Sequence, residues 1–355
     1  MFAVRSSGHH SNAGFNSVNN SGVVIDVRNI KSLSVGDNDV VRVGAGCTSG
    51  EIYDFAEKNN LSVMGVVLAD GRIINANPQE NADLYLVLKG GGPNYGIVTR
   101  FDLQAYPTIS TQYTVNLHNP SDYANILEAT VKVQEAMEKD PKISLFVSFQ
   151  SGFVAVGLLY ADSPAERPKA FDPFFNLKSL INTAVPTTNG TIKSLVTSIA
   201  YLGPSARRTQ STATTRPSHE LYVKVHEHFS EVDKTTPAEL FYTIQPLSSN
   251  AVREGVKRGG NILGLEEVSQ TWWAVSGVWT AVEAVDNFRC GIERIARNRG
   301  KLLDFVFMND GSPTQTVLDT YGAGNVKKMR DASTKYDPEG IFQKLQNNGV
   351  LLRKI

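Results

Sequence analysis

The sequence predicts a mixed α+β chain in which one region is inserted into another. Residues 1–105 alternate short apolar runs, glycine-containing turns and short helical patterns. Between residue 106 and about residue 300 the patterns are longer, with amphipathic helices and alternating strands. Residues 301–355 return to short elements and are expected to rejoin the first region. The length of 355 residues agrees with two domains, because a domain typically has about 150 residues.

The first region is expected to consist of short strands, turns and helices. The apolar run 22–27 predicts a buried strand, and 40–46 predicts a second strand that glycines close. Thr48 and Glu51 have the spacing of a capping box, so a helix is expected to begin there. The other expected elements are a strand, an Asp70-Gly71 turn and a second strand over 65–76, a helix from Pro78 to Leu88, and a strand over 96–101.

Longer elements are expected in the rest of the chain. Apolar residues recur at helical spacing within 121–139. The uncharged stretch 143–161 is long enough to suggest a membrane span, but its alternation and its central turn residues predict a hairpin instead. The remaining expected elements are an irregular section rich in Pro, Thr and Ser over 184–219, a helix over 221–229, strands over 239–245 and 268–279, a helix over 280–297, and a helix from Tyr321.

Composition excludes several classes of function. Lys and Arg together number 35, as do Asp and Glu, so the net charge is zero and nucleic-acid binding is not expected. Cys47 and Cys290 are too few for a disulfide framework or a cysteine-rich zinc site. His226 and His228 lack a nearby Cys/Asp cluster, so we expect surface residues rather than metal ligands. The first residues lack the apolar core of a secretory signal.

The segment from Arg5 to His10, Arg-Ser-Ser-Gly-His-His, is the first that could carry chemistry. Its small residues allow close approach of a ligand, and successive N–H groups can form an anion-binding nest. Arg5 could add a charge for phosphate, and His9 has a nucleophilic ring nitrogen. The alternative is a Gly/Ser turn with two exposed histidines beside a frayed terminus.

The glycine-rich segment 89–99, Lys-Gly-Gly-Gly-Pro-Asn-Tyr-Gly-Ile-Val-Thr, could let a dinucleotide cross the backbone. A strand rather than a helix is expected after it, so it does not meet the Rossmann fingerprint. A nicotinamide-dependent dehydrogenase is therefore the weaker interpretation. The structural alternative is a loop between a helix and a strand.

These two segments, with Asp26 and 43–46 between them, resemble the PCMH-type FAD-binding domain of vanillyl-alcohol oxidase-type flavoenzymes. The most similar group is the fungal FAD-linked oxidoreductases of the berberine bridge enzyme-like group. That family typically shows Arg-Ser-Gly-Gly-His, a strand ending in Gly-x-Gly, then LADG and LKGGG-NFGIVT. The chain matches with 67–71, 90–99, Phe307-Met308-Asn309-Asp310 and 335–343. The resemblance implies an FAD-binding domain plus an antiparallel-sheet substrate domain with helices.

The resemblance also implies roles for individual residues. His9 matches the histidine bonded to the flavin C8α methyl, and Asn309 matches a polar residue near the flavin ring. The other residues implied in cofactor binding are Arg5, Ser6, Ser7 and Gly8 in the pyrophosphate loop, the adjacent His10, and Gly96, Ile97 and Val98 along the adenosine half. Residues 1–105 and 301–355 would then form the FAD-binding domain, and 106–300 the substrate domain.

The substrate walls are expected on two strands of the second region, near Tyr242 and Gln245 and near Trp272 and Trp273. Ordinary core packing is the alternative for these aromatic residues. No catalytic base can be assigned. Tyr242 is a candidate only because a phenol on a substrate-facing strand is common in such sites, and a half-buried structural tyrosine is the alternative.

The sequence departs from the family pattern in three places. It begins almost at the flavin-linking loop, and Ser7 stands where the family has the first glycine of a pair. Near 65–67 the family's long glycine-rich segment, which holds a second pyrophosphate loop and in some members a flavin-linking cysteine, is absent. Cys47 lies too early to be that cysteine. The FAD-binding domain is therefore expected to be incomplete.

The expected function is that of an FAD-dependent oxidase. A small organic substrate would lose a hydride to flavin N5, and molecular oxygen would reoxidise the flavin. Family members act on alcohols, sugars, alkaloids and polyketide-like compounds, many in fungal secondary metabolism. The alternative is a non-catalytic, flavin-free remnant or an incomplete gene product. No nucleic acid or membrane partner is expected. Full-length family members are often secreted, but the sequence does not give a location.

Overall fold

The structure, a computed structural model, describes residues 1–37, 40–59, 65–67, 71–199 and 207–355. The chain forms two compact units. The first unit comprises Met1–Thr108, Gly259–Gly264 and Pro313–Ile355, and the second comprises Ile109–Arg258 and Leu265–Ser312. The assignment of 1–105 and 301–355 to FAD binding, and of 106–300 to substrate binding, stays a prediction. The family's glycine-rich segment was expected to be missing near 65–67. The structure describes residues 65–67 there, whereas 60–64 and 68–70 lie outside the described residues.

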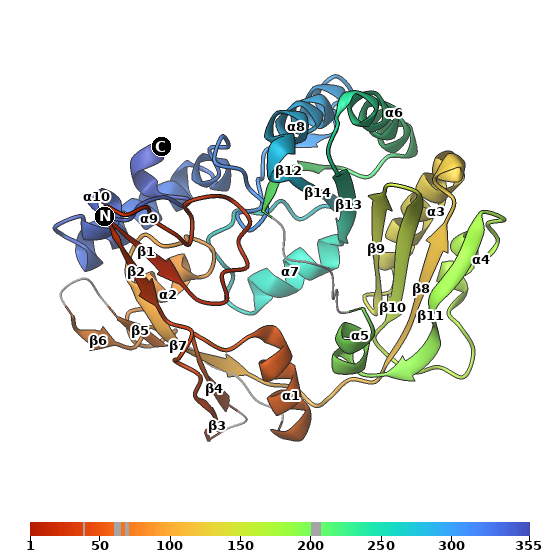
Figure 1. Ribbon diagram of the computed structural model, residues 1–355. Coiled ribbons are helices and arrows are strands. Elements are labelled where there is room, and N and C mark those ends of the chain that lie inside the picture. The colour runs from red at the N-terminus through yellow and green to blue at the C-terminus, as the bar shows by residue number, and fades with distance from the viewer. Residues whose placement is uncertain (38–39, 60–64, 68–70, 200–206) are drawn as a thin grey trace. The chain divides into compact units, whose positions relative to one another are not determined.

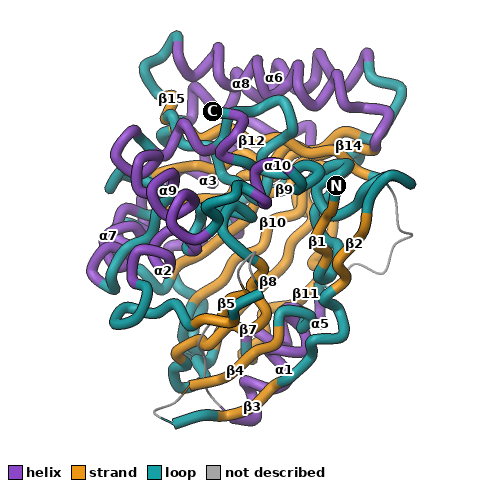
Figure 2. The backbone as a smooth tube through the Cα atoms, turned by 90° about the vertical axis from the view of Figure 1, so that its left-hand side faces the viewer, coloured by secondary structure: helices purple, strands orange, loops and turns teal. Residues whose placement is uncertain are grey.

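The strands of the first unit are β1 (Phe2–Arg5), β2 (Val23–Asp26), β3 (Leu33–Val35), β4 (Val40–Gly44), β5 (Gly65–Val67), β6 (Ile73–Ile74) and β7 (Ile97–Gln104). Its helices include α1 (Ser49–Asn59), α2 (Ala82–Leu88), α9 (Ala323–Tyr336) and α10 (Ile341–Lys344). β1 and β2 form a parallel pair, visible side by side in Figures 1 and 2. The other strands form an antiparallel sheet in the order β3-β4-β7-β5-β6.

Local signals explain several elements of the first unit. The expected capping box at α1 is confirmed, since Thr48 N–H donates to Glu51 at 2.7 Å and Glu51 N–H donates to Thr48 Oγ1 at 3.4 Å. α2 begins at Ala82 rather than Pro78, because the Asn77 side chain first holds a turn by accepting from two backbone amides. The strand expected at 22–27 is confirmed by β2, but its expected burial is wrong, because among the described residues β2 pairs with β1 alone and Val23 is 65% exposed. Asp70 of the expected turn lies outside the described residues.

The C-terminal residues complete the first unit. Phe2 of β1 exchanges backbone hydrogen bonds with Leu345 (2.8 Å) and Asn347 (2.7 Å). The buried carboxylate of Asp337 accepts from the first two amides of α10, at 2.8 and 2.9 Å. Helix α9 confirms the helix expected after Tyr321. The last residues of the chain are thus structural partners of the first.

The second unit contains one antiparallel sheet with strand order β11-β8-β10-β9-β13-β14-β12-β15. Figure 2 shows β8, β9 and β10 side by side within it. Its strands are β8 (Thr111–His118), β9 (Ile143–Gln150), β10 (Phe153–Tyr160), β11 (Leu180–Gly190), β12 (Arg208–Thr215), β13 (Leu240–Leu247), β14 (Gln270–Val278) and β15 (Leu302–Leu303). Its helices include α3 (Tyr123–Met137), α4 (Asp172–Phe175), α5 (Ile192–Ser198), α6 (His219–Thr235), α7 (Ser249–Lys257) and α8 (Val282–Arg297).

The expected hairpin over 143–161 is confirmed by β9 and β10, which pair in register across the turn at Ser151 and Gly152. None of the described helices combines the length and apolar character needed to cross a membrane. The expected irregular section over 184–219 is wrong, because it contains β11, α5, β12 and the start of α6. Threonine is β-branched and suits a strand once partners are present, and β12 lies between β14 and β15. Residues 200–206 lie outside the description.

The two faces of this sheet differ in character. Helices α3, α6 and α8 lie on one face of the sheet (Figure 1). The hydrophobic core beneath them contains Tyr242, Ile244 and Trp273. Side chains alternate between faces along a strand, so the neighbouring residues point the other way. We call this other side the polar face. By cross-strand register it contains Ser148, Thr212, Thr214, Thr243, Gln245, Trp272, Ala274 and Ser276.

His226 and His228 are not surface residues, and that expectation is wrong. His226 is 7% exposed in the core, and His228 lies against Gly291, where α6 meets α8. The His226 ring packs on Tyr123 at 4.4 Å and on Phe149 at 4.7 Å. Its Nδ1 shares a 2.9 Å hydrogen bond with the Tyr242 hydroxyl. Burial lowers the pKa of His226 to about 4.

This buried histidine makes the second unit sensitive to acid. The folded pKa lies below the unfolded value of 6.5. The stabilisation is therefore complete above about pH 6.5 and decreases as the pH falls toward 4, by about 3 kcal/mol in total. Tryptophan fluorescence during urea unfolding measures this, because Trp272, Trp273 and Trp279 all lie in the second unit.

The variant His226→Phe should be less stable at pH 7.5, because Tyr242 loses its partner, but should show a flatter pH dependence between 6.5 and 4. His219→Phe, at an exposed position of the same helix, is the control and should keep the wild-type slope. Equal slopes for His226→Phe and wild type would contradict the assignment.

Candidate functional site

Arg5 of the N-terminal segment is held in an ion-pair cluster. Its guanidinium contacts Asp26 at 2.7 Å, and Arg28 contacts the same carboxylate at 2.7 Å. Hydrogen bonds from Arg28 and Arg5 hold the pKa of Asp26 well below its usual range. Two arginines share one carboxylate, so the cluster keeps one net positive charge beside the loop. That charge suits a nearby anion such as a phosphate.

The two glycine-containing segments predicted to bind the cofactor meet in the first unit. Ser6 Oγ donates to the carbonyl of Ala45 at 2.5 Å, and the Ala45 amide donates to the carbonyl of Thr99 at 2.9 Å. Ala45 therefore connects the 5–10 loop with β7, which begins at Ile97 directly after Gly96. β5 pairs with β7 at Ile97 and Val98.

Only part of the 5–10 loop is free to contact a ligand. Ser7, Gly8 and His9 are exposed, and Gly8 has a φ of 73° that favours glycine. Their amides donate to no protein acceptor in the described ranges. His10 is different, because its ring packs on Phe15 at 4.5 Å and its Nδ1 accepts from the Asn12 amide. Burial, with His9 nearby, lowers the pKa of His10. His9 is thus the available nucleophile of the pair.

The first residues of segment 89–99 make structural contacts with residues 260–263 of the first unit. The carbonyl of Lys89 accepts from Ile262, and the Lys89 ammonium donates to the carbonyl of Gly260. Gly90 has a φ of 127°, and a Cβ there would lie 2.4 Å from Leu263. A glycine is required at 90 for these reasons, without any ligand.

Asn94 is the centre of a hydrogen-bond network in the same segment. Its side chain is fully buried and makes four hydrogen bonds. The Nδ2 group donates to the carbonyls of Gly91 (2.7 Å) and Val350 (3.0 Å). The Oδ1 atom accepts from the Leu352 amide and from Gln343 Nε2, both at 2.9 Å. One amide thus joins the glycine loop to two C-terminal turns.

Asn309 belongs to the second unit, whereas the other predicted cofactor residues belong to the first. Its carbonyl accepts from Gln210 of β12, and its own side chain is exposed. Phe307, two residues earlier, packs on Trp272 of β14 with ring centroids 4.4 Å apart. Residues 305–310 therefore run across the polar face next to β12 and β14.

The predicted substrate walls divide between the two faces of the sheet. Gln245 and Trp272 point to the polar face, whereas Tyr242 and Trp273 are fully buried in the core. The expectation that Tyr242 faces a substrate is therefore wrong, because alternation along β13 turns the phenol toward α6. Its hydroxyl bonds to His226, and burial raises its pKa. We assign it no catalytic role.

Asp310 is a candidate that sequence reasoning missed. Its Oδ2 atom is buried and has no hydrogen-bond donor among the described residues. Burial raises the pKa of this carboxyl to about 6. Thr214 Oγ1, on the polar face opposite Trp272, is likewise buried without a partner among those residues. Asp310 directly follows Asn309, the residue that matches the family motif, and this was a signal in the sequence. The burial of the Asp310 carboxyl could not be predicted from the sequence.

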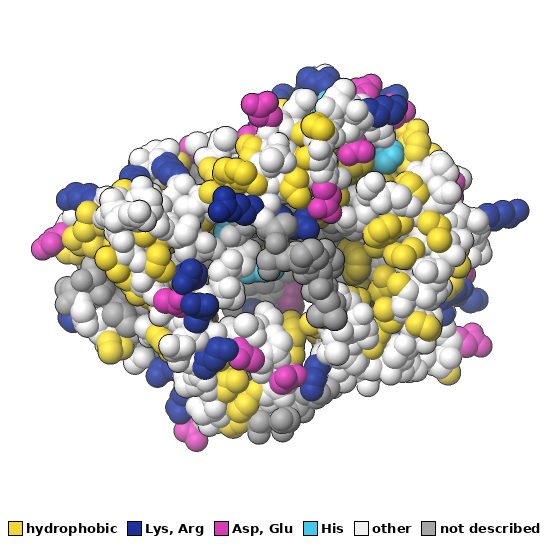
Figure 3. Space-filling view, in the orientation of Figure 1, with side chains coloured by type: hydrophobic (Ala, Val, Ile, Leu, Met, Phe, Trp, Pro, Cys, Tyr) yellow, Lys and Arg dark blue, Asp and Glu magenta, His cyan; other side chains and the backbone are white. Residues whose placement is uncertain are grey.

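The described histidines, cysteines and carboxylates do not gather at one place. In the described ranges, no group of three or more His, Cys, Asp or Glu side chains is placed to hold a metal ion. Burial and the nearby Glu51 raise the pKa of the Cys47 thiol, which disfavours the reactive thiolate. Basic and acidic side chains are interspersed over the face that Figure 3 shows.

Relatives of the chain are FAD-dependent fungal enzymes. An FAD-dependent monooxygenase of Arthrobotrys oligospora is 32% identical over 397 residues, covering 99% of this chain and 77% of the relative. The FAD-dependent monooxygenase yanF of Aspergillus niger is 28% identical over 408 residues, covering 99% and 69%. No family model matches the chain. An alignment of 397 positions against 355 residues leaves at least 42 positions of the first relative without a counterpart here.

Solved structures share the fold. Glucooligosaccharide oxidase from Acremonium strictum, whose FAD is 6-S-cysteinyl and 8α-N1-histidyl linked, matches with a TM-score of 0.77 at 15% identity, covering 98% of this chain and 86% of that chain. This likeness shows a PCMH-type FAD-binding oxidase fold. The residues of the 5–10 loop fit two parts of such a cofactor. The free amides of Ser7 to His9 and the positive charge of the Arg5 cluster suit a pyrophosphate, and the exposed His9 ring suits attachment of the flavin.

The Asn94 network predicts a large local effect of a small change. In Asn94→Asp two donors are lost and a buried carboxylate faces the carbonyls of Gly91 and Val350. We expect a loss of about 3 kcal/mol, seen as hydrogen exchange about 100-fold faster at 343–352. Tryptophan fluorescence should report an unchanged second unit. The exposed Asn20→Asp is the control, and unchanged exchange in Asn94→Asp would contradict the network's importance.

Proposed function

The chain belongs to the FAD-dependent oxidoreductases of the berberine bridge enzyme-like group, and from this premise we propose that it oxidises a small organic alcohol with molecular oxygen as the final acceptor. The observation that carries the proposal is the link from Ser6 through Ala45 to Thr99, which joins the two segments that match the family's cofactor-binding motifs. Fungal secondary metabolism is the proposed setting, since the relatives are fungal FAD-dependent monooxygenases.

We propose that His9 forms the covalent bond to the flavin. The exposed ring of His9 and the structural commitment of His10 support this choice. Ser7 and Gly8 would hold the pyrophosphate through their free amides, with Arg5 and Arg28 supplying positive charge. Bound FAD supplies the hydride acceptor.

The polar face of the second unit is the proposed substrate wall. Trp272 and Phe307 provide an apolar surface, and Thr243 and Gln245 provide hydrogen-bonding groups beside it. Asp310 is the proposed acceptor of the proton that the substrate hydroxyl releases. Its Oδ2 atom has no hydrogen-bond donor among the described residues, and a substrate hydroxyl could be that donor. A pKa of about 6 leaves the carboxylate ionised at neutral pH.

Two other outcomes have specific support. The missing alignment positions favour a flavin-free remnant or an incomplete gene product. The relatives' description as monooxygenases favours oxygen insertion instead of simple oxidation. An oxidase releases one hydrogen peroxide for each oxygen consumed, whereas a monooxygenase transfers ¹⁸O from labelled oxygen to product. Measuring both with a panel of alcohols separates these activities.

Covalent attachment is tested by acid precipitation of the purified protein after incubation with FAD. In wild type and in His10→Asn, which keeps an acceptor for the Asn12 amide, the flavin absorbance should stay with the pellet. In His9→Ala it should move to the supernatant, because the nucleophile is gone. A wild-type protein that takes up no FAD at all would support the flavin-free alternative instead.

If Asp310 accepts the proton, Asp310→Asn should change both the oxidation rate and the pH dependence of stability. Oxidation should fall by about 10²-fold or more, with flavin content retained, and the wild-type rise in rate through about pH 6 should disappear. Stability gives a readout that does not depend on activity. The folded pKa exceeds the unfolded value, so the stabilisation is present below about pH 4 and lost as the pH rises through 6.

Asp310→Asn should therefore gain stability relative to wild type between pH 4 and pH 7 in the tryptophan-monitored urea assay. Comparing variant with wild type removes the opposite contribution of His226. Asp304→Asn, at an exposed position of the same segment, is the control and should match wild type in both assays. A normal rate profile in Asp310→Asn would reject its role in proton transfer.

A further inference from the structure

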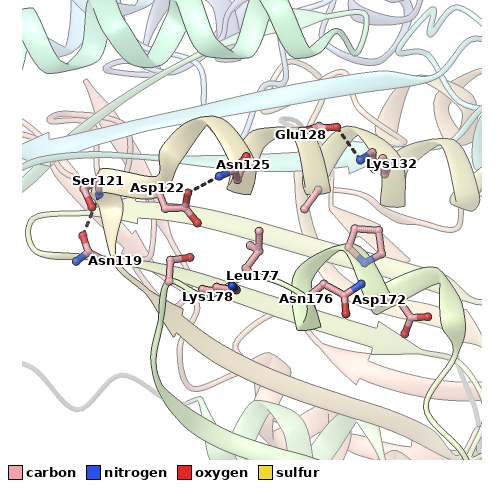
Figure 4. A pocket seen from close by; sticks show the side chains of 13 residues that line it. Asn119, Ser121, Asp122, Asn125, Glu128, Lys132, Asp172, Asn176, Leu177 and Lys178 are labelled. Carbon is pink, nitrogen blue, oxygen red and sulfur yellow. Dashed lines mark hydrogen bonds and ion pairs between the residues drawn. The ribbon is translucent and has the colours of Figure 1, made fainter.

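The second unit has a groove that the proposed redox chemistry does not use. Figure 4 shows it between the N-terminal half of α3, with the preceding turn Pro120–Asp122, and residues 172–179. The cavity has a volume of about 700 Å³. Both walls lie on the side of the sheet that the helices cover, since α3 and α4 pack on the hydrophobic core. The sheet therefore separates this groove from the polar face.

The charges that line the groove nearly balance, with three carboxylates and two ammonium groups, and Arg167 outside the lining pairs with one of the carboxylates. Glu128 is paired with Lys132 at 2.6 Å, and Asp172 is paired with Arg167 at 2.6 Å. The other charged lining residues are Asp122 and Lys178, one of each sign. An anion would meet three carboxylates, and a cation would meet ammonium groups. The lining therefore favours a neutral ligand over an ion.

The uncharged groups are arranged on opposite walls. On one wall Asn125 Nδ2 donates to Asp122 Oδ1 at 2.6 Å, which orients both side chains and leaves each with further acceptor or donor capacity. Figure 4 shows Asn176 and Lys178 on the facing wall. Pro173 and Leu177 add apolar surface. These walls match a ligand whose groups both donate and accept hydrogen bonds and whose ring has an apolar face.

We propose that this groove binds a neutral saccharide, with its hydroxyls between the Asp122–Asn125 pair and Asn176. A sugar hydroxyl is both donor and acceptor, which a mixed set of carboxylate, amide and ammonium groups can satisfy. The lining contains no aromatic side chain, so ring stacking is absent and the affinity should be in the millimolar range.

The test is saturation-transfer NMR with cellobiose, titrated to about 50 mM on the full chain under anaerobic conditions so that turnover does not interfere. We expect saturable binding in wild type and at least about tenfold weaker binding in Asn125→Ala/Asn176→Ala, which removes two hydrogen-bonding side chains. Glu135→Ala, at an exposed position of α3 outside the groove, is the control and should bind as wild type does.

Fold integrity is checked by tryptophan-monitored unfolding, and Lys178→Ala provides a second variant if the double variant fails to fold. Inorganic phosphate and spermidine serve as charged probes. Absence of saturable cellobiose binding would overturn the proposal, as would equal binding by wild type and either groove variant. Tighter binding of either charged probe at the same residues would reject the neutral-ligand assignment.

Discussion

The buried side-chain amide of Asn94 is the interaction on which the first unit depends. An amide in the interior must satisfy two donors and two acceptor positions, because each unsatisfied group costs about 1–3 kcal/mol. Asn94 does so with Gly91, Gln343, Val350 and Leu352. The loop around it is therefore fixed by the C-terminal turns. The position of β7, which begins three residues later, follows from this constraint.

The alternation of side chains along β13 and β14 has a similar consequence in the second unit. Adjacent residues point to opposite faces, so Trp273 belongs to the core while Trp272 belongs to the polar face. Sequence neighbours with similar chemistry thus have unrelated roles. The same rule removes Tyr242 from consideration as a catalytic group. It also directs attention to Asp310, which lies in the segment crossing the polar face.

Elements that depend on residues close in the chain could be predicted from the sequence. Strand pairing and burial that depend on distant residues could not. The hairpin at 143–161 and the capping box at Thr48 depend on residues close in the chain, and both are confirmed. β11 and β12 were missed because their strand character comes from pairing with distant strands rather than from apolar alternation. The family motif predicted which segment binds the cofactor. The motif alone assigned the flavin bond to His9, but the contacts of His10 with Phe15 and Asn12 are visible only in the folded loop.

The dependence of the first unit on the C-terminal residues has a consequence for biosynthesis. A chain emerges from the ribosome N-terminus first, and domains generally fold as units. The second unit ends at Ser312, so all of its residues are available while 313–355 are still being made. The first unit has its N-terminal strands long before Leu345, Val350 and Leu352, the residues that hold β1 and Asn94, have been synthesised. Its completion is therefore a late event, so the unit that matches the cofactor-binding motifs matures after its companion.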